Sequence, residues 1–353
     1  MAEETGIEWC DSTFNPWIGC TKVSEGCNGC YAEVSTPART QKIMWGPGQA
    51  RHRTAPANWA KPMAWERGHL SFELKHGRRR RVFCASLADV FDNEVDPAWR
   101  ADLFKLISET PNLDWLLLTK RIGNAERMID EAMNTLHHRK WGDKMPGDPA
   151  CNWPDDGWDN VWLGATVVNQ EEADRDIPKL LAVPARVRFL SIEPLLGPVD
   201  LTNIQTRVGT GTDVFSALEY DGDPDDDVEF GTATLDWVVV GGESGAQARP
   251  MHPDWVRSLR DQCASASVPF LFKQWGEWCT SQQMTDQTGD SLYTDDLSQY
   301  RVDHQAMDNT GATSFDAEKL SGGARTPVYR IGKASAGRLL DGQLHNGYPK
   351  DQP

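Results

Sequence analysis

A chain of 353 residues, of which 39% are hydrophobic, is long enough to bury the core of one large α/β domain. Its formal net charge of −16, from 36 Lys and Arg against 52 Asp and Glu, repels polyanions and excludes a protein that coats DNA by charge alone. No run approaches the roughly 20 apolar residues of a membrane-spanning helix, so we expect no membrane segment. The acidic start, MAEETGIEWC, lacks the features of a secretion signal, which predicts a cytoplasmic protein.

The first predicted element is a short strand at NPWIG, residues 15–19, and three of the eight cysteines follow it directly. Cys20, Cys27 and Cys30 have the spacing C-x6-C-x2-C, and Gly26 precedes the second cysteine, as a loop that wraps a metal centre requires. In a reducing cytoplasm, such cysteines are metal ligands or free thiols rather than disulfides. Thiolate ligands select zinc or an iron–sulfur cluster.

The number of nearby cysteines favours the iron–sulfur cluster over zinc. A structural zinc site needs four ligands, and the nearest candidates for the fourth are Cys10 or a distant histidine. Three cysteines without a fourth suit a [4Fe–4S] cluster that keeps one iron open for an exogenous ligand. We therefore expect a cluster at Cys20, Cys27 and Cys30, with zinc and three incidental thiols as the alternatives.

A dense basic run, KHGRRRRV, occupies residues 75–82 and includes the four arginines Arg78 to Arg81. A solvated loop that leads into a strand is the favoured interpretation of this run, and a phosphate-contacting patch is the alternative. Because the chain as a whole is acidic, any contact with nucleic acid has to be local.

Short apolar segments alternate with helical patterns from residue 80 onward. Six such alternating segments argue for right-handed βα units and a parallel sheet, and the strand at 15–19 makes seven, which suits a full or partial parallel (β/α) barrel. The predicted strands are 81–86, 114–120, 160–167, 187–194, 235–245 and 269–275, and the predicted helices are 97–110, 124–138, 170–182 and 253–265.

Segments rich in Gly, Pro and Asp interrupt this alternation near residues 140–160 and 203–234, which predicts two loop insertions. Beyond about residue 280 the sequence becomes polar and loses its periodicity. We therefore predict a barrel domain over 1–280 and an irregular C-terminal extension over 281–353.

Polar residues gather where each predicted strand ends. In a barrel these ends form the rim that carries the active site, although each residue alone is equally well explained as a helix cap or a rim ion pair. The adjacent glycines of GGESG allow a ligand to approach the backbone closely, and no dinucleotide or P-loop motif occurs. The strand-end residues are Ser86 and Asp89; Thr119, Lys120 and Arg121; Thr166 and Asn169; Ser191 and Glu193; Gly241, Gly242, Glu243 and Ser244; and Lys273 and Gln274.

A three-cysteine loop after a short strand, followed by a βα barrel with polar strand ends, resembles the radical S-adenosylmethionine (SAM) superfamily. More narrowly, the chain resembles a phage-associated family of radical-SAM-like proteins with a three-Cys motif. The resemblance covers roughly residues 6–280. It rests on NPWIGCTKVSEGCNGCYAE, SLADVFD, LLLTKR, RFLSIEPLLGPV, DWVVVGGESG and FKQWGEW, in that order.

The resemblance implies a barrel of the radical SAM or TIM-barrel type, with a [4Fe–4S] cluster held by Cys20, Cys27 and Cys30. It also implies an enzyme that reductively cleaves SAM to a 5′-deoxyadenosyl radical, supplied with electrons by a reductant such as a flavodoxin or ferredoxin. The methionyl group of SAM would bind the open iron. The rest of the cofactor would be held by some of the strand-end residues Ser86, Asp89, Lys120, Glu193, Gly241, Gly242 and Glu243.

The chain departs from the superfamily pattern at two points. The first cysteine gap is six residues rather than three, with Tyr31 after the last cysteine instead of an aromatic before it. The GGE element follows a late strand rather than the second one. The phage-type resemblance and the arginine run suggest a nucleotide or nucleic-acid base as substrate, and the catalytic residues stay unassigned. The alternative function is a non-catalytic, zinc-stabilised barrel that binds a protein or nucleic-acid partner.

Overall fold

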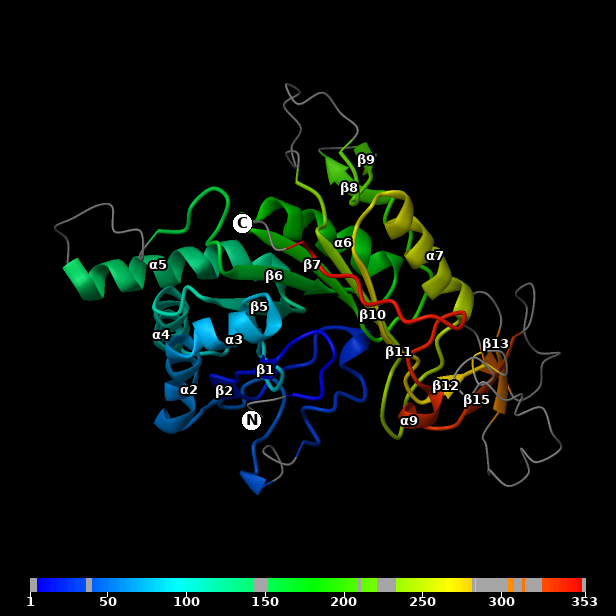
Figure 1. Cartoon of the computed structure of the whole chain (residues 1–353), viewed down its shortest axis with the longest axis horizontal. Helices are drawn as coiled ribbons and strands as arrows, with labels where there is room; N and C mark the ends of the chain where they lie inside the picture. Colours follow the sequence, from blue (N-terminus) through cyan, green and yellow to red (C-terminus); the bar gives the residue numbers. More distant parts are fainter. Residues whose placement is uncertain are drawn as a thin grey trace. The chain divides into compact units, whose positions relative to one another are not determined.

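The computed structural model of the chain describes residues 5–35, 40–141, 152–208, 211–220, 233–280, 283, 304–307, 313–314 and 326–350. Strands and helices alternate along it, as the labels in Figure 1 show. Among the described residues, every helix is too short or too polar to cross a membrane. Parts of the predicted insertions near 140–160 and 203–234, and much of the extension over 281–353, lie outside the described residues.

The main sheet has seven strands in the order β1-β4-β5-β6-β7-β10-β11, which is also their order in the chain. The pairings β1–β4, β4–β5, β5–β6, β7–β10 and β10–β11 are all parallel. Parallel strands in chain order are the topology of a complete or partial (β/α) barrel, so the predicted α/β class with a parallel sheet is confirmed. The strands are β1 (Ser12–Thr13), β4 (Arg80–Cys84), β5 (Leu113–Thr119), β6 (Val161–Thr166), β7 (Val187–Ile192), β10 (Trp237–Gly241) and β11 (Phe270–Gln274).

The predicted first strand at 15–19 was wrong in its position. The sheet begins instead at Ser12–Thr13, and the β2 strand, Trp17–Ile18, pairs antiparallel with β3 (His52–Arg53) in a separate two-stranded sheet. The reason lies at residue 16, where proline has no N–H to donate to a ladder. After Pro16 the chain therefore pairs with β3 instead of β4. Gly19, at φ +112°, then forms a parallel bridge with Ala88.

The four predicted helices are confirmed, two of them to the residue. They are α4 (Pro97–Ser108), α5 (Ala125–Trp141), α6 (Gln170–Ala182) and α7 (Pro253–Ser265). The α4 helix begins where Asp96 accepts a hydrogen bond from the Ala98 amide (2.8 Å) and Pro97 occupies the first turn. The helices α2 (Pro56–Arg67) and α3 (His69–His76) were not predicted, because Pro62 inside α2 and the lack of a clear apolar face hide them.

Contacts divide the chain into two compact units. The first covers residues 1–165 and 179–188, and the second covers residues 166–178 and 189–350. The first unit contains the cysteine loop and the strands β1, β4 and β5. Its core includes the fully buried Trp115 and Phe14, whose rings meet edge to face with centroids 5.6 Å apart.

The arginine run is absorbed into the first unit. Arg78 makes two hydrogen bonds to Asp11 (2.6 and 2.9 Å), Arg80 lies over the Phe72 ring, and the buried Arg81 lies over Trp162. The Arg79 side chain is 41% exposed. Neither the solvated loop nor the phosphate patch describes this run, because three of its four guanidinium groups hold neighbouring elements together.

The second unit contains β10 and β11 and an antiparallel sheet in the order β12-β15-β13-β14. The latter strands are β12 (Trp278–Cys279), β13 (His304–Met307), β14 (Thr313–Ser314) and β15 (Thr326–Arg330), and the short helix α9 (Lys333–Ala336) follows. The extension predicted to be irregular therefore contains regular elements among its described residues. The sequence did not show them because these strands are short and β15 contains Pro327.

The end of the chain runs beside β11, as the red segment in Figure 1 shows. The Phe272 amide donates to the His345 carbonyl (2.9 Å), and the Gly347 amide donates to the Phe270 carbonyl (2.9 Å). The indole of Trp237 also donates to the Gly347 carbonyl (2.8 Å). This segment covers the edge of β11, which would otherwise present unpaired backbone groups.

Replacing Gly347 with alanine tests this contact. A Cβ at Gly347 would lie 2.7 Å from both the nitrogen and the oxygen of Phe270, so the segment has to move away from β11. We expect the free energy of unfolding to fall by about 1–3 kcal/mol in urea titrations. Gly6→Ala is the matched control, because a Cβ there meets nothing within 4 Å. Equal midpoints for the two variants would contradict the close approach.

Candidate functional site

The three-cysteine loop lies in the first unit, and its described thiols are all free. Cys27 ends a short 3-10 helix, η1 (Glu25–Cys27), which starts where the Ser24 hydroxyl accepts a hydrogen bond from the Gly26 amide (3.0 Å). Cys30 packs against an apolar cluster that includes Ile18 and Leu87. Cys27 is buried, and Cys20 and Cys30 are half-buried.

Two buried arginines hold the first cysteine and its neighbour. Arg121 donates from Nη1 to the Cys20 sulfur (3.4 Å) and from Nη2 to the Thr21 carbonyl (2.7 Å). Arg51 donates from Nη2 to the Thr21 hydroxyl (2.7 Å) and from Nε to Asp92 (2.8 Å). The side chains of Arg51 and Arg121 are only 1% and 7% exposed, so these contacts are fixed by packing.

The surroundings of Cys20 disfavour a free thiolate. Burial and, after it, the charge of Asp89 raise the pKa of the Cys20 thiol to about 12, against the lowering effect of Arg121. The thiol is therefore protonated at neutral pH. A bound metal ion supplies the positive charge that displaces this proton, and metal binding at Cys20 would release it.

Asp89 ties the loop after β4 to the end of β5. Its Oδ1 accepts hydrogen bonds from the Thr119 hydroxyl (2.7 Å) and the Phe91 amide (2.9 Å), and its Oδ2 accepts one from the Lys120 amide (3.0 Å). The side chain is buried. Asp89 is thus committed to the scaffold of the site rather than available to a ligand.

Ser86 and Lys120, in contrast, keep groups that a ligand could use. The Ser86 hydroxyl accepts a hydrogen bond from Asn15 (2.9 Å), and its carbonyl accepts one from the Tyr31 hydroxyl (2.8 Å). Lys120 is half-buried, and within the described part of the chain its ammonium group makes no hydrogen bond or ion pair. Lys120 therefore offers a cation at the carboxyl end of β5.

The remaining predicted residues lie in the second unit, where Glu193 forms a polar cluster with strand-end residues of β11. The Lys273 ammonium contacts both oxygens of the Glu193 carboxylate (2.8 and 2.9 Å). The Gln274 amide donates to the same carboxylate (3.1 Å) and to the Ser244 hydroxyl (3.2 Å). The Oε1 atom of Gln274 is buried and has no hydrogen-bond partner among the described residues, so this cluster has an unused acceptor.

The glycines of GGESG serve close packing in this unit. A Cβ at Gly241 would lie 3.2 Å from Cδ of Glu193, and one at Gly242 would lie 1.8 Å from the Trp275 carbonyl oxygen. Gly242 therefore has to be glycine for the turns after β10 and β11 to interlock. Packing is thus a sufficient reason for both glycines.

Glu243 is held separately from Glu193. Arg249 donates to its carboxylate from Nε, from Nη2 and from the backbone amide, each at 2.8 Å. This bidentate pair occupies both oxygens of a buried carboxylate. A ligand role for Glu243 requires Arg249 to give way.

Arg51 and Arg249 were not singled out in the sequence as site residues. Each of these arginines lies in a loop that carries no recognisable motif. Each meets its acidic partner, Asp92 or Glu243, only once the chain is folded. Lys273 and Gln274 carried a signal, because they stand at a predicted strand end. The structure brings Glu193 together with Gly241, Lys273 and Gln274, and it brings Asp89 together with Lys120 and Arg121.

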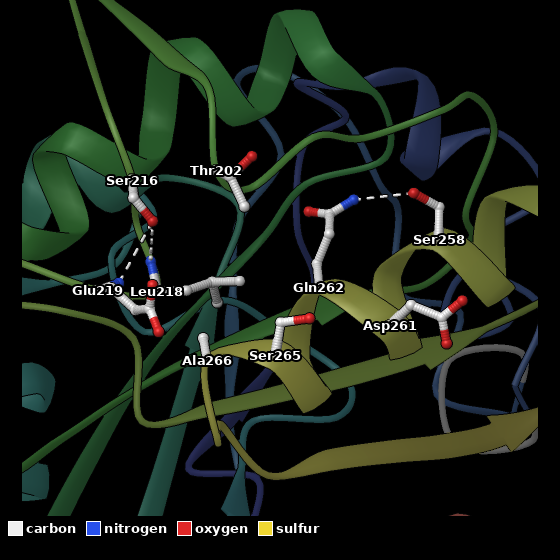
Figure 2. A pocket seen from close by; sticks show the side chains of 9 residues that line it. All are labelled: Thr202, Ser216, Leu218, Glu219, Ser258, Asp261, Gln262, Ser265 and Ala266. Carbon is white, nitrogen blue, oxygen red and sulfur yellow. Dashed lines mark hydrogen bonds between the residues drawn. The ribbon is translucent and has the colours of Figure 1, made fainter.

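A separate cavity of about 390 Å³ lies in the second unit beside α7 (Figure 2). It contains none of the predicted site residues. Gln262 at its wall is already committed, since its amide nitrogen donates to Ser258 (2.9 Å) and its Oε1 accepts from the Leu201 amide (2.7 Å). The lining residues are Thr202, Ser216, Leu218, Glu219, Ser258, Asp261, Gln262, Ser265 and Ala266.

Residues 4–349 match the sequence profile of a family described as Protein of unknown function (DUF5131). The chain belongs to the DUF5131 family. No curated protein and no solved structure matches it. Membership in DUF5131 brings no activity with it, so the function has to be argued from the site.

The cysteine loop of this DUF5131 protein fits an iron–sulfur cluster in the kind and number of its donors. Three free thiols lie on one loop, and the first receives an arginine N–H, which a metal-bound thiolate accepts better than a neutral thiol does. Among the described residues, no group of three or more His, Cys, Asp and Glu side chains is already arranged around a metal position. The fit therefore rests on the chemistry of the donors and not on their arrangement.

Replacing Asp89 with asparagine tests the scaffold of the site. The change removes a buried charge and turns an amide toward groups that donate, so we expect the free energy of unfolding to fall by roughly 3–5 kcal/mol in chemical denaturation. Asp96→Asn is the matched control, because asparagine caps a helix as well as aspartate does. A stability loss as small as that of the control would show that the Asp89 carboxylate is dispensable.

Proposed function

We propose that this DUF5131 protein is a radical SAM enzyme that binds a [4Fe–4S] cluster through Cys20, Cys27 and Cys30. The observation that carries the proposal is the set of three free thiols on one loop, the first of them hydrogen-bonded to a buried guanidinium group. Three thiolates leave one iron of a cubane without a protein ligand, which is the position that SAM takes in this superfamily. The radical SAM type of barrel and the cytoplasmic location belong to the same proposal.

When bound, the cluster and SAM supply the electron and the leaving group for reductive cleavage, which amino-acid side chains alone do not provide. The chain's own residues bind and orient. The ammonium group of Lys120 is suited to a carboxylate, and the Ser86 hydroxyl to a polar group beside it. Asp89 fixes the Lys120 backbone through its hydrogen bond to the amide (3.0 Å).

In the second unit, the polar cluster of Glu193, Lys273 and Gln274 offers both donors and acceptors. Its carboxylate and the unused Oε1 of Gln274 suit hydroxyl or amino groups of a nucleoside. Gly241 and Gly242 leave the backbone there without side chains.

The substrate class we propose is a nucleotide or a single nucleic-acid base. The net charge of −16 opposes binding of a long polyanion. The arginine run does not provide a basic patch for phosphates, because Arg78, Arg80 and Arg81 make contacts within the first unit. A small nucleotide needs only local contacts, and a reductant such as a flavodoxin or ferredoxin completes the system.

Metal analysis of anaerobically purified protein tests the proposal. We expect about four irons per chain, with broad visible absorption, and formation of 5′-deoxyadenosine when SAM and dithionite are added. Cys30→Ala is the control and should lose both properties. A colourless protein with one zinc per chain would instead support the alternative, a non-catalytic zinc-stabilised barrel that binds a protein or nucleic-acid partner.

Cys10 decides whether the site has a fourth protein ligand. This cysteine is buried at 9% exposure, just before β1. We expect Cys10→Ala to leave the iron content unchanged, because three thiolates suffice for a cluster with one open iron. A loss of metal as large as that of Cys30→Ala would make Cys10 a ligand and leave no position for SAM.

A further inference from the structure

The guanidinium group of Arg121 donates a hydrogen bond to the sulfur of Cys20 (3.4 Å). Arg121 lies two residues after β5, and its amide donates to the Thr119 hydroxyl (2.8 Å). Its side chain lies 3.7 Å from Asp89 and 3.8 Å from Asp92 and donates to the Thr21 carbonyl (2.7 Å). With 7% of the side chain exposed, the guanidinium is almost fully screened from solvent.

Thr21 is held from a second side as well. The Thr21 hydroxyl accepts a hydrogen bond from Arg51 (2.7 Å), which also donates to Asp92 (2.8 Å) and contacts Glu94 (3.1 Å). The residue next to Cys20 is thus clamped at its carbonyl and at its hydroxyl. Next to Cys30, the contact is made by a neutral group, since the Tyr31 hydroxyl donates to the Ser86 carbonyl (2.8 Å).

The charges around Cys20 explain why Arg121 matters once a metal is bound. Arg51 and Arg121 face Asp89, Asp92 and Glu94, and Arg100 interacts electrostatically with Asp89 and Asp92 as well. Arg121 is the group that donates a hydrogen bond to the sulfur, at 3.4 Å. Hydrogen bonds to ligand sulfurs and nearby positive charge stabilise the reduced form of an iron–sulfur cluster.

We infer that Arg121 is a positioning residue that fixes the Cys20 sulfur for the cluster and raises the reduction potential of that cluster. The inference rests on the proposed function, because it concerns a cluster ligand. It goes beyond that function in assigning unequal roles to the three cysteines. Cys20 is the rigid, hydrogen-bonded ligand, and its electronic state is set by one arginine from the end of β5.

Two substitutions of Arg121 and one control test the inference on the full chain. Arg121→Gln removes the charge, and Arg121→Lys keeps the charge but loses the planar fork that reaches both the sulfur and the Thr21 carbonyl. Arg100→Gln is the matched control. Arg100 is also buried, and it donates to the carbonyls of Val90 and Asp92 (3.0 and 2.9 Å).

The readouts are the midpoint potential of the cluster, from titration with dithionite followed by electron paramagnetic resonance, and the rate of iron loss to a chelator. We expect Arg121→Gln to have a lower midpoint potential than the wild type and to lose iron about 10-fold faster. Arg121→Lys should have an intermediate potential. Arg100→Gln should keep the wild-type midpoint potential even if its melting temperature falls as far as that of Arg121→Gln.

A potential in Arg121→Gln equal to that of the wild type, at full iron loading, overturns the inference and leaves the proposed function intact. If Arg121→Gln does not fold, an unchanged potential in Arg121→Lys together with unchanged iron loss overturns it in the same way. A lowered potential in Arg100→Gln also contradicts it, because the effect would then be a general one of losing a buried charge. A wild-type protein without iron overturns the proposed function, and the inference falls with it.

Discussion

The buried carboxylate of Asp89 is the constraint on which the first unit's site depends. It accepts hydrogen bonds from the Thr119 hydroxyl and from the Lys120 and Phe91 amides, and it lies 3.7 Å from the Arg121 guanidinium. Through these contacts one side chain fixes the loop after β4 to the end of β5. Because the carboxylate is buried, these partners are needed to compensate its charge.

From Asp89 the network extends to the cysteine loop by way of arginines. Arg121 reaches Cys20 and Thr21, and Arg51 reaches Thr21 and Asp92. Buried ion pairs of this kind are costly to desolvate and contribute less to stability than to a defined geometry. Here the defined geometry is the position of one sulfur, which is the feature that a metal site demands most strictly.

The second unit fixes its strand ends by close packing at glycines as well as by ion pairs. Gly242 lets the turn after β10 pack against the Trp275 carbonyl, and Gly347 lets the last segment of the chain lie along β11. The Arg249–Glu243 pair then closes its own turn, while Glu193, Lys273 and Gln274 keep polar groups at the carboxyl ends of their strands. The same GGE sequence thus contains two packing glycines and an engaged carboxylate.

The sequence by itself determined the alternation of strands and helices and the presence of three thiols on one loop. Both are local properties, because hydrophobic periodicity and cysteine spacing do not depend on distant partners. It also predicted which residues stand at strand ends, since parallel strands present the same end to one edge. Hydrophobic periodicity also gave the bounds of the helices 170–182 and 253–265 to the residue.

Only the tertiary structure decided which of these polar groups are engaged and which are free. The Cys20–Arg121 contact joins residues 101 positions apart, and the Glu193–Lys273 pair joins residues 80 positions apart. Asp89, Glu193, Glu243 and Lys120 are all charged residues at predicted strand ends. Folding gives each of the three carboxylates fixed partners at both oxygens, and it leaves the Lys120 ammonium group without one among the described residues. The physical reason is that a buried charge has to be compensated, and the compensating group comes from whichever loop the fold brings near.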